Sequence, residues 1–124
     1  MILTVSIDII IDPIHGDISC EDTRAMWLHY IRMGHVAGFL AGPPCNTWSR
    51  VRAVQLEGHN GPRVVRTPES PWGLNEVRMG ELHQVTIGTL LLGFSLECML
   101  ALAMHSGSGI LEHPKDPEDR KSVV

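Results

Sequence analysis

Apolar and β-branched residues form an unbroken run near the start of the chain. Residues 3–11 read Leu-Thr-Val-Ser-Ile-Asp-Ile-Ile-Ile, a pattern typical of a strand buried on both faces of a parallel sheet. Asp8 falls inside or at the end of this predicted strand. Pro13 and Gly16 then turn the chain into Asp17.

A helical pattern follows the turn. Residues 21–33 combine apolar positions at helical spacing with Glu21 and Asp22 in the first turn, where negative charge is favourable. Ser19 is placed to cap this helix and Gly34 to end it. The predicted apolar stripe consists of Met26, Trp27, Tyr30 and Ile31, and we expect it to face the core.

Strand and helix then alternate along the rest of the chain. Residues 36–40 predict a second strand, and residues 110–111 a short third one. Between them, residues 77–104 predict a long helix, with Gly88 and Gly93 as points where it could break. This alternation indicates an α/β fold of three layers with a mainly parallel sheet.

The segment 85–104 allows two interpretations. It is apolar enough, and about long enough, to span a bilayer. Against a span stands Glu97, whose insertion costs roughly 2.5–3.5 kcal/mol, and few basic residues flank the segment. We therefore expect a buried helix and no membrane partner, and a small membrane-anchored protein remains the alternative.

Residues 46–74 lose all periodicity and are rich in glycine and proline, which indicates a long loop. Although the 124-residue chain has a net charge of −4, four of its ten basic residues stand in this loop. They favour a local contact with phosphate, and a solvated loop is the alternative. These residues are Arg50, Arg52, Arg63 and Arg66. Residues 115–124 form a charged tail that we expect to fray.

Cysteine usage bears on compartment and on metals. The chain has three cysteines, widely spaced and odd in number, which fits a reducing compartment inside the cell, the nucleus if the source is eukaryotic. Neither they nor the seven histidines fall at metal-ligand spacing, so we expect no metal site.

One cysteine stands in an unusual setting. Cys45 follows the pair Pro43-Pro44 directly after the apolar run that ends at Leu40. Ligands and catalytic groups collect where strands of an α/β sheet run into loops, and prolines restrict the backbone there. Cys45 is therefore a candidate nucleophile, although most free cysteines are inert core residues.

Three short motifs resemble those of the DNA (cytosine-5) methyltransferases, and they stand in the order of that family. Residues 42–49, Gly-Pro-Pro-Cys-Asn-Thr-Trp-Ser, resemble its Pro-Cys motif. Gly16-Asp17-Ile18 is similar to the motif whose carboxylate contacts the adenine of S-adenosylmethionine. Leu111-Glu112-His113-Pro114 is similar to the Glu-Asn motif. The variant carried by some eukaryotic mobile elements, with arginines and a Gly-Pro-Arg after the cysteine, is closer still.

The resemblance implies a Rossmann-like S-adenosylmethionine-dependent methyltransferase fold and a role for each motif. Cys45 would add to C6 of cytosine, and Glu112 would meet the N3 edge of the base. The cofactor S-adenosylmethionine would contact Asp17, Asp8, Ile18 and Pro43, with Asp8 at its ribose. DNA would be held by Ser49, Arg50, Arg52, Arg63 and Arg66, and the target base would leave the stack. RNA stays open as a substrate.

The resemblance covers about residues 4–114, which we interpret as a partial catalytic domain followed by the tail 115–124. The sequence contains no glycine-rich cofactor loop before Asp8 and no target-recognition region after Glu112. The first strand of the family's sheet is therefore absent too, and we expect the chain to need upstream sequence or other chains of a larger polyprotein. A catalytically silent remnant of a mobile element is the main alternative to an enzyme.

Overall fold

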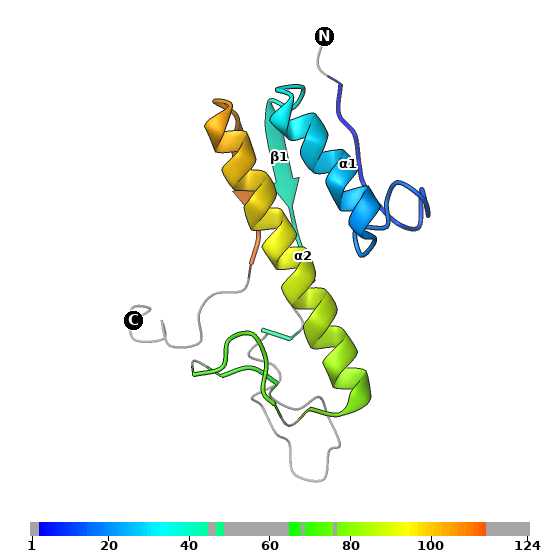
Figure 1. Cartoon of the computed structure of the whole chain (residues 1–124), viewed down its shortest axis with the longest axis vertical. Helices are drawn as coiled ribbons and strands as arrows, with labels where there is room; N and C mark the ends of the chain where they lie inside the picture. Colours follow the sequence, from blue (N-terminus) through cyan, green and yellow to red (C-terminus); the bar gives the residue numbers. More distant parts are fainter. Residues whose placement is uncertain (1–2, 45–46, 49–64, 68, 76, 114–124) are drawn as a thin grey trace, which may run out of the picture. The chain divides into compact units, whose positions relative to one another are not determined.

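The computed structural model describes residues 3–44, 47–48, 65–67, 69–75 and 77–113. Its elements are, in chain order, helix α1 (Glu21–Arg32), strand β1 (Gly38–Ala41), helix α2 (Met79–Met104) and strand β2 (Ser108–Leu111), as Figure 1 shows. Contacts divide the chain into two compact units. The first unit joins residues 1–39 to 93–110, and the second joins residues 40–92 to 111–124.

Helix α1 confirms the predicted helix, including the end at Gly34. Glu21 and Asp22 lie in its first turn and His29 and Arg32 in its last, so both charges complement the helix dipole. Gly34 takes a φ of +78°, which favours glycine and ends the helix. The predicted cap is wrong: Cys20, and not Ser19, occupies the capping position.

Helix α2 is continuous over 26 residues, so neither Gly88 nor Gly93 breaks it. At its start the side chain of Glu81 accepts a hydrogen bond of 2.9 Å from the backbone N–H of Arg78, which satisfies a donor that the helix leaves open. At its end the N–H of Gly107 bonds the carbonyl oxygen of Leu102 at 2.9 Å, and Ser106 takes a φ of +62°. This is a Schellman-type ending with serine at the position that glycine usually fills.

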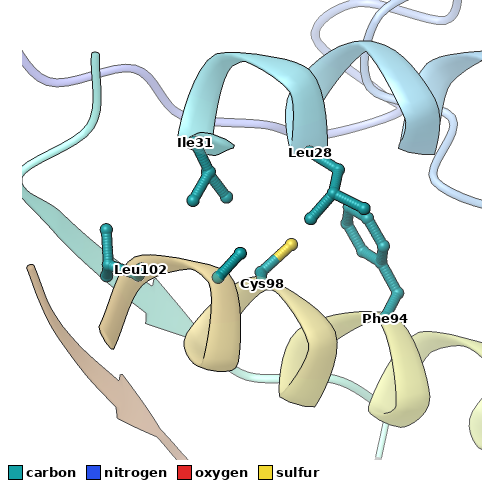
Figure 2. Packing of buried hydrophobic residues seen from close by; sticks show 6 residues of the cluster. Leu28, Ile31, Phe94, Cys98 and Leu102 are labelled. Carbon is teal, nitrogen blue, oxygen red and sulfur yellow. The ribbon is translucent and has the colours of Figure 1, made fainter. Parts of the chain in front are cut away.

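The core of the first unit forms between α1 and the second half of α2. Figure 2 shows Leu28 and Ile31 of α1 pointing toward Phe94, Cys98 and Leu102 of α2. Cys98 and Leu102 are completely buried. The predicted stripe of α1 is only partly right, because Leu28 lies in the core whereas Tyr30 is 45% exposed.

Strands β1 and β2 pair as a two-stranded parallel sheet. The N–H of Ser108 bonds the carbonyl oxygen of Ala37 at 3.2 Å, and that of Glu112 bonds Ala41 at 2.9 Å. The partners advance by four residues on both sides, which fixes the parallel register. Exposed and half-buried residues alternate along each strand. Both short strands were predicted from the sequence to within two residues.

The strand expected at residues 3–11 is wrong. Every one of these residues is exposed, and none belongs to a strand. Asp8 instead starts a turn: its carbonyl oxygen accepts the N–H groups of Ile11 and Asp12 at 3.1 and 2.9 Å. An extended segment needs a neighbouring strand for its backbone groups, and none pairs with it in the described part of the chain.

The membrane alternative has one structural observation in its favour. Helix α2 is long and apolar enough to cross a bilayer, with a mean hydropathy of 1.9, and 39% of that stretch is buried within the protein. A core helix of a soluble protein meets the same criterion. On the exposed side Leu96, Leu100 and Met104 follow one another at four-residue spacing.

Candidate functional site

The motif residues of the second unit gather where β1 and β2 end. Glu112 follows β2 directly, and its backbone N–H bonds the carbonyl oxygen of Ala41, the last residue of β1. A side-chain carbon placed on Gly42 would lie 3.8 Å from Oε2 of Glu112, so the carboxylate faces the start of the Pro-Cys motif. Neighbouring parallel strands thus release both motifs at the same edge of the sheet.

The Pro-Cys motif is described in part. Pro43 is half-buried next to the end of β1. Cys45 and Ser49 lie outside the described residues, as do Arg50, Arg52 and Arg63. Thr47 and Trp48, which follow the cysteine by two and three positions, are described: Thr47 is buried and Trp48 half-buried.

Arg66 is a buried hydrogen-bond donor in the second unit. Its Nε donates to Oγ1 of Thr47 at 3.0 Å and its Nη2 to the carbonyl oxygen of Val85 at 3.0 Å. Its Nη1 donates to the carbonyl oxygen of Pro71 at 2.8 Å and to Oγ1 of Thr89 at 3.0 Å. The side chain is only 8% exposed. The expectation that Arg66 contacts phosphate is therefore corrected: its donors are used inside the protein.

The indole of Trp48 contacts the side chains of Arg66 and His113. The guanidinium carbon of Arg66 is 3.5 Å from the ring centroid, a close cation–π stack. The ring of His113 meets the indole edge to face, with centroids 5.1 Å apart. Trp48 thus connects Arg66 to the residue that follows Glu112.

Helix α2 comes close to this cluster at Gly88. A Cβ at this buried position would lie 3.2 Å from Oγ1 of Thr47, 3.2 Å from the ring of Trp48 and 3.4 Å from Nη2 of Arg66. Glycine therefore lets the helix backbone approach the Pro-Cys motif. The sequence predicts Gly88 only as a potential break in the helix, and its spacing gives no sign of this contact.

Three of the four residues expected at the cofactor, Asp8, Asp17 and Ile18, lie in the first unit, whereas Pro43 lies in the second. Oδ1 of Asp8 accepts the N–H of Ile10 at 2.8 Å, and Oδ1 of Asp17 accepts the N–H of Ser19 at 3.1 Å and its hydroxyl at 2.5 Å. Ile18 is half-buried and packs against the core. These are the hydrogen bonds of ordinary Asx turns.

Backbone packs closely against Gly16, the residue before Asp17. A Cβ at Gly16 would overlap the carbonyl oxygen of Asp8 and lie 2.6 Å from that of Asp12. Only glycine therefore fits at residue 16, in the turn that leads to Asp17. The contact of Asp8, Asp17 and Ile18 with S-adenosylmethionine stays a prediction.

The two described cysteines differ strongly. Cys20 is exposed at the start of α1, where the backbone N–H of Thr23, followed by its side chain, lowers the pKa of the thiol. Burial raises the pKa of Cys98 to about 12, and the neighbouring charge of Glu97 adds to the effect. In the sequence Cys20 precedes two acidic residues, Glu21 and Asp22, and this position predicts a helix start.

The described residues contain no cluster of metal ligands. Among the described residues, no group of three or more His, Cys, Asp or Glu side chains comes together as metal ligands. An opening of about 290 Å³ lies in the first unit. It is lined by Arg32, Glu97, Leu100, Ala101, Met104 and His105.

Comparison of the chain with protein-family models, with curated proteins and with solved structures gave no match.

Proposed function

We propose that the chain is part of a cytosine-5 methyltransferase-like domain in which Cys45 is the nucleophile and Glu112 assists at the base. One observation carries this proposal: Glu112 bonds the last residue of β1 and turns its carboxylate toward Gly42. The segments that bear the thiol and the carboxylate thus leave the sheet side by side. Two groups that act on one base must be placed in this way.

The chemistry of the thiol step follows from the base. Cytosine C5 is a poor nucleophile until a thiolate adds at C6. When the sulfur of Cys45 forms a bond to C6, the electron pair of the C5–C6 double bond moves toward C5 and into the ring. Glu112, if protonated, donates a hydrogen bond at N3 and offsets the developing negative charge.

Methyl transfer is a separate question for this chain. S-adenosylmethionine is the donor that the resemblance implies, but Asp8 and Asp17 use their carboxylates in turns and Gly16 is closed by backbone. The proposal for these residues is therefore limited to covalent addition to the base. We expect weak or absent binding of S-adenosylmethionine by this chain in calorimetry, and micromolar affinity would contradict that expectation.

We propose DNA as the substrate, with Ser49, Arg50, Arg52 and Arg63 near the phosphates, and Arg66 removed from this set. All four remaining residues precede Val65 on the same loop. The acidic net charge of −4 favours a local contact over general binding to nucleic acid.

Hydrogen exchange at cytosine C5 tests the thiol step without a cofactor. After addition at C6, C5 takes a proton from water. Loss of the original C5 hydrogen and of the thiol then restores cytosine, with one hydrogen exchanged. We expect the chain to release tritium from duplex DNA that carries 5-tritiated cytosine, and Cys45→Ser to abolish the release. The matched control is Cys20→Ser, which removes an exposed thiol outside the motif.

The outcome distinguishes an enzyme that uses Cys45 from a catalytically silent remnant. Release that survives Cys45→Ser would reject Cys45 as the nucleophile. Absence of release by the folded wild-type chain, with Cys45 still alkylated by iodoacetamide, would favour a silent remnant. Single-stranded RNA carrying the same label, measured in parallel, decides between the two nucleic acids.

A further inference from the structure

We infer that Arg66 is a positioning residue: its guanidinium fixes Thr47 and Trp48, and through them the arrangement of the Pro-Cys motif on α2. The sequence suggested a phosphate contact for this arginine, but the structure gives it four hydrogen bonds within the chain and a stack on Trp48. The inference rests on the proposed function only where activity is measured.

The hydrogen bonds join three segments that are distant in sequence. Nε reaches Thr47, which is 19 residues away, while Nη1 and Nη2 reach Thr89 and Val85 on α2, 23 and 19 residues away. Pro71 completes the set from the segment that follows Arg66. Because the guanidinium is planar and rigid, occupying these acceptors together fixes their relative positions.

Lysine cannot replace this arrangement. An ammonium group has three donors around one nitrogen, whereas the acceptors of Arg66 are distributed over Nε, Nη1 and Nη2. An ammonium also lacks the flat face that lies 3.5 Å from the centroid of Trp48. The Arg66→Lys variant therefore retains the charge and removes the geometry.

The stack of Arg66 on Trp48 extends the positioning effect toward the segment that carries the carboxylate of Glu112. Trp48 contacts the ring of His113 at a centroid distance of 5.1 Å, and His113 is bonded to Glu112 in the chain. Arg66 thus lies at one end of a contact series that includes both motif-bearing segments. Loss of the guanidinium would loosen the residues next to Cys45 and next to Glu112 together.

The first measurement is nuclear magnetic resonance of arginine side chains. We expect the Nε–H of Arg66 to exchange slowly with water and its guanidinium protons to be shifted upfield by the indole ring. Trp48→Leu should remove the shift. Exposed Arg78 at the start of α2 provides the reference signal. An Arg66 signal that exchanges as fast as that of Arg78 would overturn the inference.

The second measurement is the release of tritium from C5 of cytosine. Arg66→Lys should reduce the rate at least about tenfold, as expected when one charge-assisted hydrogen bond of the reacting arrangement is lost. The matched control Arg78→Lys makes the same exchange at an exposed site and should leave the rate unchanged. A wild-type rate in Arg66→Lys would contradict a positioning role.

Two further measurements distinguish a positioning role of Arg66 from an effect on folding. Hydrogen exchange of the backbone N–H of Leu74, which bonds the carbonyl oxygen of Val65 at 2.8 Å, reports unfolding of the second unit and should stay slow in Arg66→Lys. If it becomes fast, Thr47→Val replaces it as the test, because this variant keeps Arg66 and removes only the acceptor of Nε. Thr47→Val should then lower the release of tritium, and an unchanged rate would overturn the inference. If the wild-type chain releases no tritium, the proposed function fails and the magnetic resonance measurement alone decides the role of Arg66.

Discussion

The indole N–H of Trp27 donates a 2.8 Å hydrogen bond to the backbone carbonyl oxygen of His15. This bond ties the turn before α1 to the second turn of the helix. Thr23 adds a second tie, since its hydroxyl donates to the carbonyl oxygen of Ile14 at 3.2 Å. The irregular residues 8–17 are thus fixed to α1 by side chains of the helix.

Replacing Trp27 by phenylalanine should therefore destabilise the first unit. The change removes one neutral hydrogen bond, worth about 0.5–1.5 kcal/mol, and reduces the ring area against the core. Urea denaturation followed by circular dichroism measures the effect. Trp72→Phe is the matched control, because Trp72 is 61% exposed and should change stability little. Equal effects of both variants would contradict the anchoring role of Trp27.

Cys98 should make stability depend on pH above about 9. The ordinary pKa of the thiol is 9.0, and burial raises it to about 12 in the folded chain. Between these values the unfolded chain loses a proton that the folded chain retains, so the free energy of unfolding falls as pH rises. Stability of the wild type and of Cys98→Ala, measured from pH 8 upward, should show a smaller decline in the variant. Parallel declines would reject this contribution.

The two described thiols should react at very different rates. Cys20 is exposed and has a lowered pKa, whereas Cys98 is completely buried and has a raised one. Near neutral pH, iodoacetamide should modify Cys20 well before Cys98, since the thiolate is the reacting form. Peptide mass spectrometry measures both sites in one sample. Urea should remove the difference, and protection that persists in urea would point to another cause.

Ser106→Gly should stabilise the end of α2. Ser106 has a φ of +62°, which costs a residue with a side chain roughly 1 kcal/mol. Glycine adopts this conformation without strain, so we expect a gain of about 0.5–1 kcal/mol in the free energy of unfolding, reduced by the greater freedom of glycine in the unfolded chain. Ser108→Gly is the control at a serine without positive φ and should not stabilise. Thermal denaturation compares the two.

Vesicle flotation tests the membrane alternative for α2. We expect the chain not to float with phosphatidylcholine vesicles, because its apolar residues Phe94, Cys98 and Leu102 are already packed against α1. The neighbouring Glu97 lies 3.6 Å from Arg32 and gives the exposed side of the helix charged groups. Flotation that Leu100→Glu abolishes would favour the membrane-anchored reading instead.

Local sequence patterns were sufficient to predict both helices. Acidic residues before the apolar stripe and Gly34 after it defined α1, and the length of the apolar run defined α2. The segment 3–11 was misjudged, because β-branched composition signals a strand only when another strand is available for pairing. Its neighbours in sequence give no information about such a partner.

The candidate site was predictable only as a sequence of motifs. Glu112 was placed correctly at the end of a strand, since the apolar pair before it marks that strand. Arg66 was misassigned because it stands in a series of loop arginines, and its burial depends on acceptors at Thr47, Val85 and Thr89. Contacts across such separations leave no periodic signal in the chain.

Gly88 sets a packing requirement for the second unit. Its missing side chain is what allows α2 to lie against Thr47 and Trp48, whereas the core made by Leu102 does not depend on it. Because the two residues belong to different units, a larger side chain at residue 88 should disturb the packing around Thr47 and Trp48 and leave the core around Leu102 intact. The two ends of one continuous helix therefore tolerate substitution independently.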